Sequence, residues 1–108
     1  CNALSAALEN GAPRDVAVSG VAANALGARR IGSICFDLAR EHGLEVVEVP
    51  DSAILQAQAE LWQRHRLLVE PAGATALAAL QWGAYVPAPG ERVAVLLCGG
   101  NVSPDPLG

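Results

Sequence analysis

The residues best suited to chemistry stand at the end of an apolar run. Residues 93–97 are followed directly by Cys98, Gly99, Gly100 and Asn101. A thiol is a weak hydrogen-bond donor and acceptor, and glycines let a backbone or a ligand come close. If the run is a parallel strand, its carboxyl end predicts a binding site. Spacing alone leaves a simple turn open as a second interpretation, with Cys98 as a small buried side chain.

A second segment with chemical potential is EPAGATALAAL, residues 70–80. Pro71 suits the first position of a helix, where a missing amide hydrogen is tolerated. From residue 72 to 79 no side chain except Leu77 is larger than threonine. Such a face lets another backbone or a flat ligand approach closely. Glu70 supplies a carboxylate beside it, and a role limited to helix capping at the surface stays open for this residue.

The chain lacks the residues that several other chemistries require. All seven basic residues are arginine, so no lysine amine is present as a nucleophile. His42 and His65 have no partner at metal-ligand spacing, which predicts no metal site. We also expect no catalytic residue within this chain. Three cysteines without CxxC spacing favour reduced thiols in a cytoplasmic protein.

Composition narrows the class of partner. A net charge of −4 argues against nucleic acid. No window approaches the roughly 20 apolar residues of a membrane span. The chain is 52% hydrophobic and only 17% charged, which indicates surface meant for burial elsewhere.

Periodicity and turn residues predict alternating helices and strands. Helices are expected over 2–9, from about residue 30 to Gly43, from a cap at Asp51 to Arg66, and from Pro71 to Gly83. Strands are expected over 16–18, 44–49 and 93–97. In the second helix, a buried stripe is expected of Ile31, Ile34, Cys35 and Leu38.

This order predicts an α/β fold, a partial three-layer sandwich with a mostly parallel sheet. The segment 93–97 is apolar on both faces, which is typical of an interior strand with neighbours on both sides. The chain offers only two or three strands, so we expect the sheet to be incomplete and its remainder to come from other residues.

The segments VEPAGATALAAL and RVAVLLCGGNV, in this order, resemble the C-terminal signature of serine/threonine dehydratases. These are fold type II pyridoxal-phosphate enzymes, related to the β subunit of tryptophan synthase. The resemblance extends upstream through SGVAANALGARRIG and DSAILQAQAELWQRHRLLVEPAG. It implies that residues 1–108 are the C-terminal part of a catalytic domain that binds pyridoxal 5′-phosphate.

The resemblance also implies roles at the cofactor. Cys98 matches the residue that faces the pyridine nitrogen, and Glu70 the glutamate near the ring, with Gly73 in the helix start behind it. Gly20 matches the glycine whose backbone lies against the ring. Gly99 and Gly100 shape the adjoining turn. Ser19 departs from the pattern, because many relatives carry aspartate there, and this puts any role of that acid in doubt.

The implied reaction removes water and then ammonia from L-threonine or L-serine and leaves a 2-oxo acid. In the family, a lysine forms a Schiff base with the cofactor and a glycine-rich loop holds its phosphate; both are expected upstream of this chain. The chain alone is therefore expected to be inactive. Its expected partners are that upstream part, a small amino-acid substrate and further copies in a homo-oligomer. A serine racemase-like enzyme and a small non-catalytic α/β binding or regulatory module remain alternatives.

Overall fold

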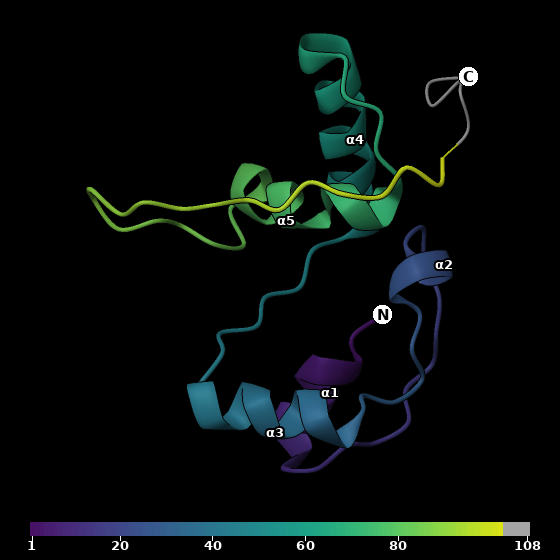
Figure 1. Ribbon diagram of the computed structural model, residues 1–108, viewed down its shortest axis with the longest axis vertical. Coiled ribbons are helices and arrows are strands. Elements are labelled where there is room, and N and C mark those ends of the chain that lie inside the picture. The colour runs from purple at the N-terminus through teal and green to yellow at the C-terminus, as the bar shows by residue number, and fades with distance from the viewer. Residues whose placement is uncertain (103–108) are drawn as a thin grey trace. The chain divides into compact units, whose positions relative to one another are not determined.

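The computed structural model describes residues 1–102 and divides the chain into two compact units, Cys1–Glu48 and Val49–Gly108. Figure 1 shows the helices that form within each unit. The first unit contains α1 (Ala3–Asn10), α2 (Ala23–Leu26) and α3 (Ser33–His42), and the second contains α4 (Asp51–His65) and α5 (Pro71–Trp82). No helix within residues 1–102 has the length and apolar character needed to cross a membrane.

In the first unit, α1 packs against α3. Ala7 of α1 is fully buried, and Phe36 and Ala39 of α3 are 4% and 2% exposed. The two α3 residues are three positions apart and therefore share one face of the helix. One aromatic ring and several alanines make this a small core.

The predicted buried stripe of α3 is wrong. Ile34 is 75% exposed, Leu38 is 49% exposed, and Cys35 is exposed as well. The helix carries apolar residues on two sides, and α1 covers only the side that holds Phe36. Sequence periodicity locates the apolar faces of a helix. It cannot tell which of two such faces is buried.

In the second unit, α4 and α5 form the main packed pair. Ala57 of α4 and Ala74 and Ala78 of α5 are fully buried, and Leu61 is 3% exposed. Alanine adds no side-chain entropy cost on burial and keeps helix axes close together. The small-residue character of α5 therefore positions it tightly on α4.

Glycines mark the C-terminal ends of α3 and α5. The expected ends at Gly43 and Gly83 are confirmed, with φ of 60° and 85°. α4 instead ends at His65, and its C-cap is Arg66, a non-glycine residue at φ 55°. The Arg66 guanidinium donates to the Trp62 carbonyl and lies 5.8 Å from the centroid of the Trp62 ring. α4 begins at Asp51 itself, with Pro50 in the N-cap position where the sequence predicted Asp51.

The predicted α/β sandwich with a mostly parallel sheet is wrong: about half of residues 1–102 are helical and none lies in a strand. A strand exists only when its amides and carbonyls pair with a neighbouring backbone. Residues 16–18 have one such bond, from the Val16 N–H to the Arg29 carbonyl at 2.7 Å. Residues 93–97 make none to another described segment, and Leu96 is 76% exposed. Apolar, β-branched content alone therefore did not identify a sheet.

Ala78→Val is expected to destabilise the intact protein by about 1 to 3 kcal/mol, because the added methyl groups have no room between α4 and α5. Denaturant unfolding measures this loss. Ala76→Val is the matched control, since Ala76 lies on the exposed side of the same helix. Equal losses in both variants would contradict the packing described.

A surface ion pair gives the first unit a pH-dependent element. The Arg30 guanidinium donates to the Asp15 carboxylate at 2.7 Å and, with its positive charge, lowers the pKa of that carboxyl. Arg30→Gln should raise the pKa of Asp15 towards its ordinary value, as measured by NMR titration. The pair's stabilising effect is then present at neutral pH and lost as pH falls through the folded-state pKa. Arg14→Gln should leave the Asp15 titration almost unchanged.

Candidate functional site

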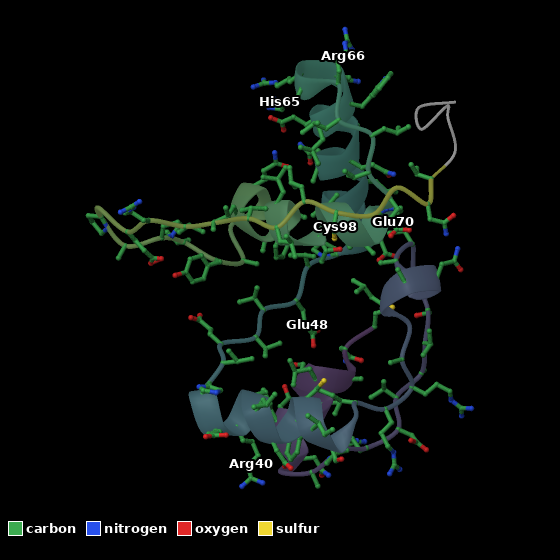
Figure 2. All side chains as sticks on the ribbon, in the orientation of Figure 1. Arg40, Glu48, His65, Arg66, Glu70 and Cys98 are labelled. Atoms are coloured by element: carbon green, nitrogen blue, oxygen red, sulfur yellow. The ribbon has the colours of Figure 1, made fainter. Side chains whose placement is uncertain are left out.

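The candidate site is a corner where the segment after residue 97 passes the first turn of α5. Figure 2 shows Cys98 and Glu70 next to each other at this point. The Glu70 N–H donates to the Gly99 carbonyl at 2.8 Å, and the Gly73 N–H donates to the Glu70 carbonyl at 2.9 Å. The loop and the helix start are thus joined through their backbones. We call residues 98–100 with Glu70 and Gly73 the Cys98 corner.

Gly73 is the closest point of contact in the Cys98 corner. A Cβ atom on this buried residue would overlap the Cys98 carbonyl oxygen and lie 2.6 Å from the Cys98 carbonyl carbon. The Cys98 peptide therefore rests on the bare Cα of Gly73. The family resemblance placed Gly73 behind Glu70, and the structure adds the reason for a glycine there.

Gly99 is constrained twice. Its φ is +86°, which L side chains rarely adopt. A Cβ atom would also overlap the Glu70 side chain and lie 2.7 Å from the Glu70 Cδ. Gly100 differs, since nothing lies within 4 Å of the position its Cβ would take. The corner is closed on the Glu70 side and open at Gly100.

The functional groups of the corner are a thiol and a carboxylate. Cys98 is exposed and Glu70 is half-buried. Glu70 stands at the N-cap position of α5, but its side chain makes no capping hydrogen bond. Its stem instead packs against Gly99. Side-chain capping of α5, the alternative role for Glu70, is therefore not seen.

Gly20 belongs to the other unit. Its φ is +100°, and its carbonyl accepts the Ala23 N–H at 3.2 Å at the start of α2. Next to it, the Ser19 carbonyl accepts a hydrogen bond from the Cys1 thiol at 3.3 Å. Four of the five predicted site residues, Cys98, Glu70, Gly99 and Gly100, therefore come together, and Gly20 is positioned by a separate turn.

Sequence reasoning missed one polar residue beneath the corner. Gln58 of α4 is 9% exposed and donates from Nε2 to the Val69 carbonyl at 2.9 Å. The available signal in the sequence was an amide on the same helical stripe as Ile54 and Leu61, the stripe that α4 buries. No cluster of residues suited to a metal ion occurs among residues 1–102.

The corner suits a flat heteroaromatic ring better than a metal ion or an anion. It offers an exposed thiol that can meet a ring nitrogen, and beside it Gly100, where no side chain fills the space. The chain has no lysine, so it offers no amine to an aldehyde. The residues present thus fit one edge of a pyridine-type cofactor.

Comparison with known proteins agrees with this chemistry. The family model described as pyridoxal-phosphate dependent enzyme matches residues 1–99. The chain is 38% identical over 101 residues to the biosynthetic L-threonine dehydratase of Salmonella typhimurium and 37% identical to that of Escherichia coli, in each case over 93% of this chain. It is 34% identical over 100 residues to the phenylserine dehydratase of Ralstonia pickettii.

The chain therefore belongs to the pyridoxal-phosphate dependent enzyme family. The predicted resemblance and the cofactor of the whole protein are confirmed. The chain spans 20% of the length of the two threonine dehydratases and 31% of the phenylserine dehydratase. It corresponds to one part of each of these relatives.

Gly73→Ala is expected to destabilise the intact protein by about 1 to 3 kcal/mol, because the new methyl group must displace the Cys98 carbonyl. The same change should alter the rate at which the Cys98 thiol is modified. Gly100→Ala introduces the same methyl group into open space and should stay within about 0.5 kcal/mol of the unmodified protein. A Gly73→Ala protein with unchanged stability and thiol reactivity would show that the contact is absent in solution.

Proposed function

We propose that the Cys98 corner forms one edge of the cofactor site in a pyridoxal-phosphate dependent dehydratase of β-hydroxy amino acids. The observation that carries the proposal is the joint position of Cys98 and Glu70, which lie 28 residues apart in the sequence but meet at the start of α5. The family membership supports it, and the printed names of the relatives support the reaction class.

When bound, the cofactor acts as the electron sink that allows the α-proton and the β-hydroxyl of the substrate to be removed. Within this chain, Cys98 would face the ring nitrogen. A neutral thiol is a weak donor and leaves that nitrogen largely unprotonated, whereas a carboxylate would keep it protonated. With the ring nitrogen neutral, the ring would be a weaker electron sink, and Cys98 would thereby suit a reaction in which the hydroxyl leaves promptly.

The other corner residues would shape the surroundings of the ring. Gly99 and Gly100 keep side chains away from its edge, and Glu70 places a carboxylate next to it. Gly20 would lie against one ring face in the complete protein. The amine that binds the cofactor aldehyde and the loop that holds its phosphate would come from other parts of the longer protein, so residues 1–108 alone would be inactive.

The relatives point to a substrate class and leave the particular substrate to other residues. Two are named for L-threonine and one for phenylserine, and a fourth, 31% identical over 74 residues, is the L-threo-3-hydroxyaspartate ammonia-lyase of a Pseudomonas species. All four match overlapping parts of this chain although their substrates carry different β-substituents. We therefore assign the recognition of that substituent to residues outside this chain. A homo-oligomer and a cytoplasmic location remain predictions.

The activity is tested by supplying the full-length protein with pyridoxal phosphate and L-threonine, L-serine or phenylserine, and by measuring release of the 2-oxo acid. Release with at least one substrate is expected. Conversion of L-serine to D-serine without 2-oxo acid would favour the racemase-like alternative. No turnover and no cofactor absorbance would favour the non-catalytic module.

The role of Cys98 is tested by changing the group offered to the ring nitrogen. Cys98→Ser should keep the activity within about tenfold, because a hydroxyl is also neutral. Cys98→Asp should lower kcat by more than about tenfold, which corresponds to about 1.4 kcal/mol in activation free energy, and should shift the cofactor absorbance. Cys35→Asp is the control, since it adds the same charge at an exposed position of α3. Equal effects of the two aspartates would contradict the assignment.

A further inference from the structure

The side chain of Gln58 is buried in the second unit and makes a hydrogen bond there. It is 9% exposed, and its neighbours on the inner face of α4 include the fully buried Ala57 and Leu61 at 3% exposure. An amide buried among apolar groups costs free energy unless it is hydrogen-bonded. Here Nε2 donates to the Val69 carbonyl at 2.9 Å.

The acceptor belongs to the peptide group that also holds the Cys98 corner. The Val69 carbonyl and the Glu70 N–H are the two ends of one planar peptide unit. The carbonyl end accepts from Gln58 at 2.9 Å, and the N–H end donates to the Gly99 carbonyl at 2.8 Å. Two hydrogen bonds in series therefore connect the interior of α4 with the residue after Cys98.

This arrangement fixes the direction of the second bond through the first. Because a trans peptide is rigid, orienting its carbonyl also orients its N–H in the opposite direction. Hydrogen bonds in such a series also polarise and strengthen one another. The bond from Gln58 therefore helps to orient the N–H group that donates to the Gly99 carbonyl.

We propose that Gln58 is a positioning residue for the cofactor corner, acting on Cys98 through the Val69–Glu70 peptide group. Gly73 limits how close the Cys98 peptide can come to α5, and the Gln58 series holds the next residue in place. Both constraints act on backbone atoms directly after the Cα that carries the thiol, namely the Cys98 and Gly99 carbonyls. The effect of Gln58 on the position of Cys98 follows from the hydrogen bonds alone. Its importance for cofactor binding rests on the proposed function.

Two substitutions separate positioning from packing. Gln58→Met keeps the length of the side chain and removes the donor. Gln58→Glu keeps the shape and can donate only when the carboxyl is protonated, a state that burial favours. The matched controls are Gln56→Met and Gln56→Glu, because Gln56 lies on the exposed face of the same helix.

The first measurement is made on the full-length protein, with Cys1 and Cys35 replaced by serine so that Cys98 is the reporting thiol of this chain. Hydrogen exchange of the Glu70 amide and modification of Cys98 by a disulfide reagent are recorded with and without pyridoxal phosphate. Gln58→Met should speed both processes about threefold to tenfold, the effect expected for losing one hydrogen bond. Gln56→Met should change neither.

The pH profile gives a readout that packing would not move. In the Gln58→Glu protein, the rates of Glu70 amide exchange and Cys98 modification are each divided by the rate in Gln56→Glu at the same pH. This ratio should be near 1 at low pH and should rise as the carboxyl loses its proton. With cofactor bound, its absorbance should shift over the same pH range. This series remains informative if Gln58→Met does not fold.

The outcomes are distinguishable from a failure of the proposed function. If Gln58→Met loses stability while Glu70 exchange and Cys98 modification stay unchanged, or if Gln58→Glu shows no pH dependence relative to its control, Gln58 is a packing residue and the inference is overturned. If pyridoxal phosphate leaves Cys98 modification of the unsubstituted protein unchanged, the ring does not cover the thiol. The proposed function then fails, and Glu70 exchange still decides the role of Gln58.

Discussion

The contact of the Cys98 peptide with the bare Cα of Gly73 is the constraint on which the candidate site depends. It brings the loop within backbone distance of α5, and only at that distance can the Glu70 N–H reach the Gly99 carbonyl. A single methyl group at position 73 would separate the two segments. The thiol and the carboxylate share one corner because this contact is made without any side chain.

The same use of small residues extends along α5. Ala74 and Ala78 pack without exposure against α4, so the helix that carries the corner is itself held closely. α4 contributes a second restraint through Gln58, whose side chain donates to the Val69 carbonyl, just before the start of α5. Close packing and a short hydrogen-bond series therefore act on the same few atoms. Such support is what a site needs if it is to hold a rigid ring at a fixed position.

The sequence predicted features that are encoded locally. The ends of α3 and α5 follow from Gly43 and Gly83, because a left-handed residue after a helix is encoded by the residue itself. The corner at Cys98 was identified because the thiol, the glycines and the EPAGA segment each have distinctive chemistry. Family membership followed from the same residues.

Features that depend on a partner could not be predicted in this way. The segment 93–97 was assigned to a sheet from its apolar residues, but a strand needs a second backbone, and none pairs with it among the described residues. α3 has two apolar sides, and the position of α1 decides which is buried. The hydrogen bond of Gln58 could not be predicted, because its acceptor, the Val69 carbonyl, is eleven residues away in the sequence.

The glycine contact has a consequence for mutational mapping. Replacement of each residue by alanine normally removes atoms and reveals what a side chain contributes. At Gly73 and Gly99 it adds atoms, and along α5 alanine is already the native residue at Ala72, Ala74, Ala76, Ala78 and Ala79. An alanine scan would therefore report crowding at the corner and would leave these five positions of the helix beside it untested. What matters most at this surface is the space that small residues leave free. Replacement by alanine cannot test that space, because it removes no atoms there.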